Sequence, residues 1–349
     1  MNRRKNIGLG FIILLVGLVA SGCGPSPEEL AATSVAQTAA AATNTPVPTS
    51  TPEPTPTATP IPYDLSLIVV GEEDAPIIGA SIKLAEEGDT QISDDVGQVF
   101  WYDLPGEVVN ISVSAQGYFP QDLSETIDRG VNQITINLER DPHGILPSEA
   151  CGPGEKLVYL EDFQDDHAQG WPEIEARAQG WDLIPHPDSA GNKVIKYSSS
   201  ITDTQMFYDD GTYEDAVWRI SVMPRGKPET IRFYWHQNED PGTYTVINYE
   251  WGVIIGRSDG STDINLGEVG RFLKENEWQT FEISTYDDTL EVWLDKILVF
   301  RYNDPKPLPG GHIGLELWAS ENEETMVYFD NLAVCELSAP FVPIPTSEP

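Results

Sequence analysis

Basic residues, histidine and cysteine are all scarce in this sequence. It has 20 Lys and Arg against 56 Asp and Glu, a formal net charge of −36. A nucleic-acid partner needs a basic surface, so this balance argues against nucleic acid and against an anionic membrane face as partner. The five histidines have no metal-ligand spacing, and no HExxH, phosphate-loop or Ser-His-Asp pattern occurs. The acidity fits a secreted surface or an affinity for divalent cations, without selecting between them.

A long hydrophobic run is also missing. Three basic residues, Arg3, Arg4 and Lys5, precede an apolar segment of only 13 residues at positions 7–19. A helix that spans a bilayer needs about 20 such residues. The segment therefore predicts a secretion signal over residues 1–22.

The signal ends in the sequence Ala20-Ser21-Gly22-Cys23. This sequence resembles the lipobox of bacterial lipoproteins, in which the cysteine is lipidated and becomes the new N-terminus. Ala20 stands where that family prefers leucine. The resemblance implies an extracytoplasmic lipoprotein, held in the membrane at the cell surface by a lipid on Cys23. The alternative is an ordinary signal peptide that is cut near Gly22 and leaves Cys23 free.

Residues 23–62 lack the pattern of a packed element. Positions 44–62 read NTPVPTSTPEPTPTATPIP, and proline fixes φ and removes backbone donors, so an extended, disordered Pro/Thr-rich tether is predicted. It holds the folded part clear of the envelope, or it is a tolerated linker with no length requirement.

Helical periodicity is absent from residues 63–140. Short alternating runs such as LSLIVV and VNISVSA, separated by turns, predict a small antiparallel β-sandwich. The phrases APIIGASIKL, SDDVGQVFWYDLPGE and VSAQGYFPQ resemble the carboxypeptidase regulatory-like domain, a transthyretin-type sandwich. The resemblance implies a stalk or scaffold module without catalytic residues. Gly79 and Gly97 are expected at turns that need a free φ.

A Pro/Gly connector at 141–155 leads to a second unit, residues 156–337, with about ten expected short strands. This pattern predicts a two-sheet jelly roll, and the last residues, 338–349, are predicted to be disordered. The unit opens with YLEDFQDDHAQGW, has a tight turn at Asp295-Lys296 in TLEVWLDKILVFRYN, and closes with VYFDNLAVCEL. This order resembles the concanavalin A-like lectin/glucanase superfamily, in its laminin G-like and keto-disaccharide-hydrolase-like branch. The resemblance implies a curved sandwich whose concave face often binds sugar.

The acidic triplet that serves the glucanases of this superfamily is absent. Glu173 and Glu175 form only an isolated pair in an expected loop, which does not provide the nucleophile and acid of a glycosidase. The prediction is a non-catalytic module that binds a glycan or glycoconjugate. Two alternatives remain open: a glycoside-cleaving enzyme with an unrecognised site, and a structural or adhesion module that binds envelope protein.

Period-two alternation in the strands sorts side chains into two faces. Aromatic rings stack on the C–H face of a sugar, and neighbouring polar groups satisfy its hydroxyls. The predicted carbohydrate-binding residues, all on faces turned away from the core, are Trp293, Trp318, Tyr234, Arg232, His236, Arg219 and Glu316. The alternative is that the two sheets expose different outer faces, so that the set never converges.

Acidic residues and cysteines at both ends of the unit suggest a calcium site and a disulfide. Many jelly-roll carbohydrate modules hold a structural calcium ion at their first and last strands, and Glu161, Asp162 and Asp330 stand in comparable places. The alternative is that these carboxylates only cap strand ends. Cys151 and Cys335 flank the unit, and the first and last strands of a jelly roll lie close together. A disulfide between them is predicted in an oxidising exterior.

Overall fold

The computed structural model describes most of the two predicted folded units. It covers residues 61–344 except 86, 190, 200–203, 227–229, 239–241 and 319–324. The signal segment, Cys23 and nearly all of the tether lie outside these residues, so the predictions made for them stay predictions. Within the described part of the chain, no helix is long and apolar enough to span a membrane.

The first unit is a β-sandwich of a three-stranded and a four-stranded sheet, with strand orders β4-β1-β7 and β3-β2-β5-β6. Alternation places one side of each strand in the core, where Leu65, Leu67 and Val69 of β1 are buried. The strands are β1 (Tyr63–Val70), β2 (Ser81–Leu84), β3 (Thr90–Ile92), β4 (Gln98–Leu104), β5 (Val108–Ser114), β6 (Gln121–Thr126) and β7 (Gly130–Asn137), with a 3-10 turn, η1, at Glu72–Asp74.

The sandwich is not wholly antiparallel as expected, because β1 and β7 pair in parallel. A parallel pair needs a long crossover, and here the rest of the sandwich supplies it. The turn glycines behave as predicted: Gly79 has a φ of 79° and Gly97 a φ of 75°. At Gly97 a Cβ atom would lie 2.5 Å from the carbonyl oxygen of Val69, so a side chain is excluded there on two grounds.

The second unit is the predicted two-sheet jelly roll. The eight-stranded sheet has the order β19-β18-β17-β12-β21-β10-β9, with β8 also paired to β21. Its strands are β8 (Lys156–Glu161), β9 (Trp181–Pro185), β10 (Lys193–Ser199), β12 (Ala216–Arg225), β17 (Gln279–Tyr286), β18 (Thr289–Leu294), β19 (Ile297–Asn303) and β21 (Thr325–Glu336). Helix α1 (Pro172–Glu175) is a single turn between β8 and β9.

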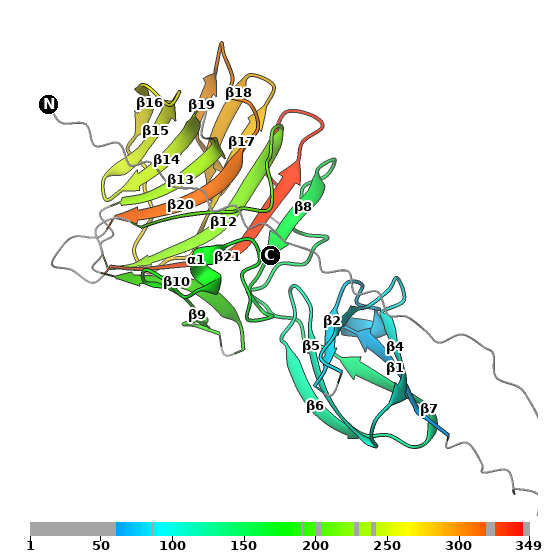
Figure 1. Ribbon diagram of the computed structural model, residues 1–349. Coiled ribbons are helices and arrows are strands. Elements are labelled where there is room, and N and C mark those ends of the chain that lie inside the picture. The colour runs from blue at the N-terminus through cyan, green and yellow to red at the C-terminus, as the bar shows by residue number, and fades with distance from the viewer. Residues whose placement is uncertain are drawn as a thin grey trace, which may run out of the picture. The chain divides into compact units, whose positions relative to one another are not determined.

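The six-stranded sheet forms the other layer, in the order β11-β20-β13-β14-β15-β16. Figure 1 shows β16, β15, β14, β13 and β20 side by side in it. These strands are β11 (Thr204–Phe207), β13 (Thr230–Gln237), β14 (Thr243–Tyr249), β15 (Gly252–Ser258), β16 (Asp263–Val269) and β20 (His312–Trp318).

An aromatic core joins the two sheets. Trp218 of β12 meets Phe233 of β13 edge to face, with ring centroids 5.9 Å apart, and Phe281 of β17 lies 4.7 Å from the same ring. All three side chains are fully buried, and each contributes about 1.5–3 kcal/mol by leaving water. The β18–β19 turn is the predicted two-residue one. Asp295 and Lys296 both have positive φ, as a type I′ hairpin requires.

The C-terminal segment differs from its prediction. Residues 338–344 were expected to be disordered, yet Phe341 is buried and its ring lies 5.9 Å from that of Trp293. The proline content of this segment prevents a strand but does not prevent one aromatic side chain from docking on the sheet. Residues 345–349 lie outside the described part.

Candidate functional site

Four predicted site residues come together on the outer face of the six-stranded sheet. Strands β13 and β20 are antiparallel neighbours, and their register pairs Arg232 with Glu316 and places Trp318 opposite Thr230. Tyr234 follows Arg232 by two residues and so shares its face. The alternate residues, such as Phe233, fill the core. Regular alternation on two paired strands therefore builds this set, which we call the Glu316 cluster: Arg232, Tyr234, Glu316 and Trp318.

The carboxylate of Glu316 is the centre of the cluster. It accepts hydrogen bonds from Arg232 Nη1 at 2.7 Å, from the Tyr234 hydroxyl and from Trp318 Nε1. Glu316 is 1% exposed. Burial, followed by the hydrogen bond to Glu316, raises the pKa of Tyr234 to about 12, so its phenol keeps the proton that it donates.

The rim of the cluster is aromatic and partly open. Trp318 is 41% exposed, and the Arg232 guanidinium lies 5.8 Å from the centroids of both the Trp318 and the Tyr234 rings. The Phe207 ring of β11 lies 5.2 Å from that of Tyr234. Gly314 of β20 permits this approach, because a Cβ atom there would lie 2.3 Å from the Phe207 ring. Arg232 Nε is buried and has no hydrogen-bond partner. The cluster thus offers an exposed ring beside a guanidinium whose side chain is 24% exposed.

Arg219 and Trp293 do not join this cluster. They lie on β12 and β18 of the eight-stranded sheet, so the two sheets do expose different outer faces. Trp293 is half-buried against Phe341 and donates to Glu291. The expectation that all seven residues form one site is therefore wrong. Strand pattern alone does not say to which of the two sheets a strand belongs.

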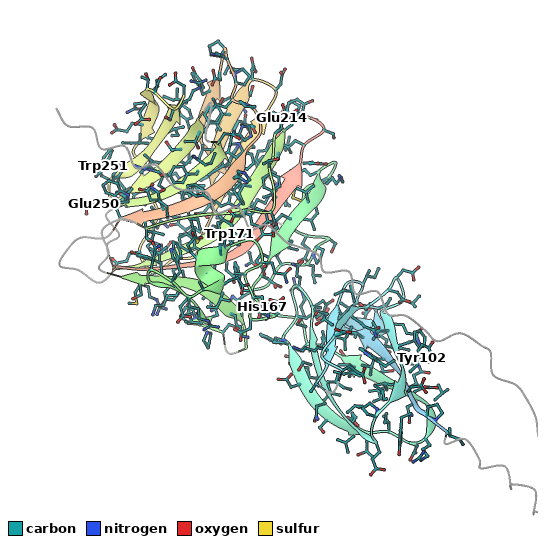
Figure 2. The ribbon with its side chains drawn as sticks, viewed as in Figure 1. Tyr102, His167, Trp171, Glu214, Glu250 and Trp251 are labelled. Carbon is teal, nitrogen blue, oxygen red and sulfur yellow. A yellow bond between two sulfur atoms is a disulfide. The ribbon has the colours of Figure 1, made fainter. Side chains whose placement is uncertain are left out.

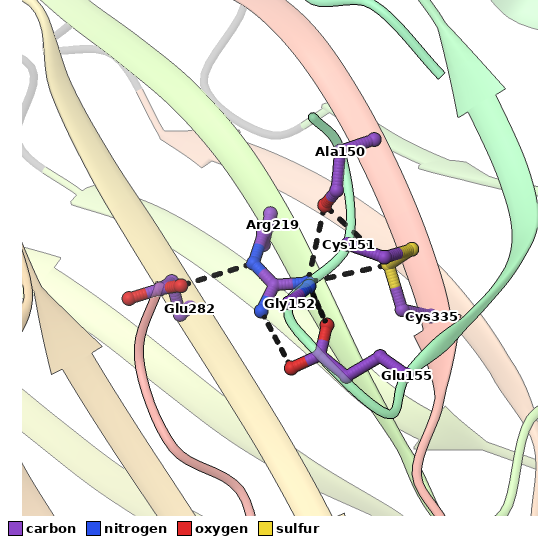
Figure 3. Close-up of a disulfide and its surroundings, with 7 residues drawn as sticks. All are labelled: Ala150, Cys151, Gly152, Glu155, Arg219, Glu282 and Cys335. Carbon is purple, nitrogen blue, oxygen red and sulfur yellow. Dashed lines mark hydrogen bonds and ion pairs between the residues drawn. A yellow bond between two sulfur atoms is a disulfide. The ribbon is translucent and has the colours of Figure 1, made fainter. Parts of the chain in front are cut away.

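Arg219 serves instead as an internal clamp beside the disulfide, which the structure contains as predicted (Figure 3). Its guanidinium makes a bidentate pair with Glu155, at 2.8 and 2.9 Å, and its Nε donates to Glu282 at 3.0 Å. Its Nη1 also donates to the carbonyl of Ala150 at 3.2 Å. All three charged side chains are buried. We call this group the Arg219 cluster: Arg219, Glu155, Glu282 and the Cys151–Cys335 disulfide.

His236 also leaves the predicted face. A β-bulge shifts the β13–β20 register between Tyr234 and Gln237, and His236 has a φ of 55°. Its ring stacks on that of the preceding Trp235 at 4.9 Å, which would be impossible if alternation continued. His236 is 2% exposed and lies on the inner side of the strand end. The extra residue of a bulge is invisible in a hydrophobic pattern.

The three predicted calcium residues are buried acids with raised pKa values. Burial, and then the charges of Asp162 and Asp141, raises the pKa of Asp330, whereas burial, and then the charges of Asp165 and Asp141, raises the pKa of Asp162. Glu161 has Asp165 as its main repulsive neighbour, and its Oε1 accepts from its own chain at the amide of Phe163. Burial is the main cause of each shift, and it raises the pKa of Asp162 to about 6 and that of Glu161 to about 8.

Two amides complete the Asp162–Asp330 group. Asn192 Nδ2 donates to Asp330 at 3.4 Å, and Gln164 donates to Asn192 Oδ1. Gln164 Oε1 and Asp141 Oδ2 are buried without partners. Among the described residues, no Lys or Arg forms an ion pair with these acids. We call the set the Asp330 cluster: Asp141, Asp162, Asp330, Gln164 and Asn192. Sequence reasoning missed Asp141, Gln164 and Asn192, because only the tertiary fold brings them to the two predicted acids.

The oxygen-rich Asp330 cluster suits a hard cation better than a transition metal. Calcium accepts carboxylate, amide and carbonyl oxygens, and two unpartnered buried oxygens are what such an ion would satisfy. In the described part of the chain, one group of three His, Cys, Asp or Glu ligand atoms lies within 4.8 Å, at Cys151, Glu155 and Cys335, so the three acids of the Asp330 cluster are not drawn together that closely. The two cysteines of that group are joined in the disulfide, so they offer no thiolates.

Comparison with known proteins identifies the second sandwich. The family described as the 3-keto-alpha-glucoside-1,2-lyase-like domain matches residues 161–335. No curated protein matches the chain.

Several solved structures are similar at low identity. A carbohydrate-binding module from Bacillus subtilis is 15% identical, covers 45% of this chain and 95% of its own, and has a TM-score of 0.34. A beta-glucanase from Bacillus licheniformis is 12% identical, covers 52% and 98%, and has a TM-score of 0.37. A galectin from Caenorhabditis elegans is 12% identical, covers 40% and 94%, and has a TM-score of 0.31. Likenesses this distant carry no argument about function.

Proposed function

The chain belongs to the 3-keto-alpha-glucoside-1,2-lyase-like domain family, and from this premise we propose that its second sandwich binds a glycan through the Glu316 cluster. The observation that carries the proposal is the pairing of an exposed Trp318 ring with the partly exposed guanidinium of Arg232. A sugar ring supplies the two matching features, an apolar C–H face for the indole and hydroxyl oxygens for the donor.

The chemistry of Glu316 favours binding over catalysis. Its carboxylate already accepts from Arg232, Tyr234 and Trp318, so it is a poor candidate to take a proton from a substrate. Tyr234 is held protonated by burial and by Glu316. The same contacts fix the rings in place, which lowers the entropy cost of binding a sugar.

A glycan array probed with the chain tests the proposal directly. We expect binding to a defined set of glycans, and we expect Trp318→Ala to abolish or strongly reduce it. Unchanged binding by Trp318→Ala would remove the Glu316 cluster as the site, and an array without signal would favour protein binding in an adhesion role.

The family description names a lyase, so enzymatic cleavage is the second candidate. It is tested by incubating the chain with a 3-keto-alpha-glucoside and with glycosides that bind on the array, and by measuring product release. Product that is formed by the parent chain and lost in Glu316→Gln would overturn the non-catalytic proposal. Binding without product would support it.

We propose further that the protein is a lipoprotein presented outside the cytoplasm, at the cell surface. The lipobox-like sequence before Cys23 would attach it to the membrane, and the tether and the first sandwich, which resembles a carboxypeptidase regulatory-like domain, would act as a stalk. The Cys151–Cys335 disulfide supports an oxidising location. Mass spectrometry of the mature protein tests this. An acylated N-terminal Cys23 is expected, and an unmodified N-terminus would contradict it.

Calcium at the Asp330 cluster is the remaining proposal. Several buried acids without basic partners destabilise a fold unless a cation or protons neutralise them. Calcium should therefore raise the melting temperature, and EDTA should lower it. Asp330→Asn should reduce the calcium response, whereas Glu161→Gln, outside the cluster, should retain it. A melting temperature indifferent to both calcium and EDTA would exclude the ion.

A further inference from the structure

A second group of aromatic rings lies at the turn between β14 and β15. Tyr249 ends β14 and pairs with Gly252, the first residue of β15, so Glu250 and Trp251 form a two-residue turn. Trp251 is 48% exposed. Figure 2 shows Glu250 and Trp251 at the end of the six-stranded sheet where β20 also ends. The turn therefore presents a large ring at a position where small polar residues are usual.

Strand register places Tyr249 on the same face as the Glu316 cluster. Thr230 of β13 pairs with Trp318 of β20 on one side and with Tyr249 of β14 on the other. Both registers are regular from Thr230 to Tyr234, and directly opposed residues of antiparallel strands share one face of the sheet. Neighbouring strands are about 4.8 Å apart, so the backbones at Trp318 and Tyr249 are about 10 Å apart across β13.

A small residue separates these two aromatic positions. Thr230 is 6% exposed, as expected for a short side chain between two larger ones. A ligand that lies across β13 can therefore contact the rings on both sides of it. We call the set the aromatic row: Trp318, Tyr249 and Trp251.

The ring of Trp251 is held in place by Tyr249. The two ring centroids are 5.2 Å apart and the ring planes differ by 6°. This stacking fixes the indole before a ligand arrives, which lowers the entropy cost of binding. Trp251 does not belong to the hydrophobic core of the sandwich, so core packing does not account for it. The ring is available to a ligand.

Polar groups accompany the rings at both ends of the aromatic row. The guanidinium of Arg232 lies 5.8 Å from the centroid of the Trp318 ring, and its side chain is 24% exposed. The carboxylate of Glu250 is exposed next to Trp251, and it has no hydrogen bond or ion pair with another described residue. A guanidinium donates to sugar hydroxyls and a carboxylate accepts from them. Each end therefore combines a ring with a hydrogen-bonding group, as sugar binding requires.

The aromatic row is longer than one sugar ring, because its two ends lie on strands about 10 Å apart. We propose that the ligand is an oligosaccharide chain that crosses β20, β13 and β14, with one sugar on Trp318 and a later sugar on Tyr249 and Trp251. This inference rests on the glycan binding proposed for the Glu316 cluster. It distinguishes a protein that binds along a glycan chain from one that recognises a single terminal sugar.

Oligosaccharides of increasing length test the inference. Malto-, cello-, laminari-, xylo-, manno- and chito-oligosaccharides of one to six units are printed on one array, and the bound series is titrated by calorimetry. We expect affinity to rise by about tenfold or more between one unit and the length that reaches both ends of the row, and then to level off. If one unit binds as tightly as six, the chain inference is wrong and the proposed glycan site stands. No signal in any series also overturns the inference.

Variants of single rings test the place. Trp251→Ala should weaken the binding of long chains by about tenfold and leave the shortest bound member unchanged, whereas Trp318→Ala should weaken every length. Trp251→Phe keeps a ring and should retain most of the gain with length. Trp251 lies in an exposed turn, so both variants should fold. Tyr102→Ala removes a ring that is 70% exposed on β4 of the first sandwich (Figure 2) and should bind like the parent.

The pattern of losses separates this inference from the proposed function. If Trp318→Ala loses binding and Trp251→Ala binds every length like the parent, the glycan site is confined to the Glu316 cluster and the chain inference is wrong. If Trp251→Ala loses binding and Trp318→Ala does not, the Glu316 cluster is not the site and both proposals fail. Equal weakening by Trp251→Ala and Tyr102→Ala would show unspecific adsorption to exposed rings and would also overturn the inference.

Discussion

The two outer faces of the second sandwich carry similar residues and differ in what covers them. The Arg219 cluster on the eight-stranded sheet pairs one arginine with two glutamates, and its arginine side chain is 6% exposed. The Glu316 cluster on the six-stranded sheet pairs one arginine with one glutamate, and its arginine side chain is 24% exposed. Connector and C-terminal residues, including Cys151 and Phe341, pack over the first. The second keeps an exposed tryptophan.

The difference separates a stabilising role from a binding role. In the Arg219 cluster every guanidinium nitrogen has a partner, so nothing is left to recognise a ligand. In the Glu316 cluster the guanidinium of Arg232 is partly exposed, so part of it can be reached by a ligand. The same residue types therefore hold the chain together on one face and remain accessible to a ligand on the other. Four paired variants can break or sharpen this comparison.

The largest effect is expected at the disulfide that closes the covered face. Cys151→Ser/Cys335→Ser removes a cross-link between residues 184 positions apart, which contributes up to about 5 kcal/mol to the free energy of unfolding in the chain-entropy model. Urea denaturation of the variant and of the reduced parent chain measures it. Cys23→Ser is the control and should unfold like the parent. A variant as stable as the parent would contradict the closing role of the disulfide.

The two arginines come next. Arg219→Met leaves two buried carboxylates without their cation and should cost about 3–5 kcal/mol of unfolding free energy. Arg232→Met leaves Glu316 with its Tyr234 and Trp318 hydrogen bonds and should cost only about 1–2 kcal/mol. Equal losses of unfolding free energy, measured by urea denaturation, would mean that the covered Arg219 cluster and the open Glu316 cluster contribute equally to stability.

Sequence reasoning reached the open face because its strands are regular. Alternation along β13 and β20 places Arg232 and Glu316 on the same side, and a chain register with no bulge at that point keeps them opposite each other. The same reasoning added Arg219 and Trp293, because alternation tells inside from outside but does not tell one sheet from the other. That assignment depends on pairings between strands far apart in sequence, such as β12 with β21.

The other positions that the sequence did not predict have local or tertiary causes. His236 was misplaced by a single bulge, a feature that leaves the hydrophobic pattern of β13 intact. Asp141 precedes the second sandwich in sequence and meets Asp330 only in the folded chain. Phe341 docks from a proline-rich segment with no strand pattern. In each case the deciding contact joins segments whose own sequences do not require it.

His236 marks where the open face ends, and its burial should appear in the pH dependence of stability. Its pKa falls from 6.5 to about 4 on folding. Above pH 6.5 His236 is neutral in both the folded and the unfolded chain, so it does not oppose folding by being protonated. As the pH falls from 6.5 towards 4 the unfolded chain gains a proton that the folded chain does not, so up to about 3 kcal/mol of stability is lost.

The matched comparison isolates this loss from that of the many carboxylates. His236→Gln, followed by urea denaturation between pH 7 and pH 4, should lose less stability than the parent chain over this window. His167→Gln, which changes an exposed histidine (Figure 2), should follow the parent. If all three curves are parallel, the pKa of His236 is the same in the folded and the unfolded chain and its burial does not lower it.

The two tryptophan variants should have the smallest effects on the free energy of unfolding. They should differ in which property changes, glycan affinity for one and stability for the other. Trp318→Ala removes the exposed ring of the open face and should weaken glycan binding by about tenfold, with an unfolding free energy within about 1 kcal/mol of the parent. Trp293→Ala removes a half-buried ring from beneath Phe341 and should cost about 2 kcal/mol of stability without changing glycan affinity. Glycan-array binding and urea denaturation are measured for both variants. If Trp293→Ala also loses glycan binding while it remains folded, the covered face takes part in recognition, and the division between a holding face and a binding face fails.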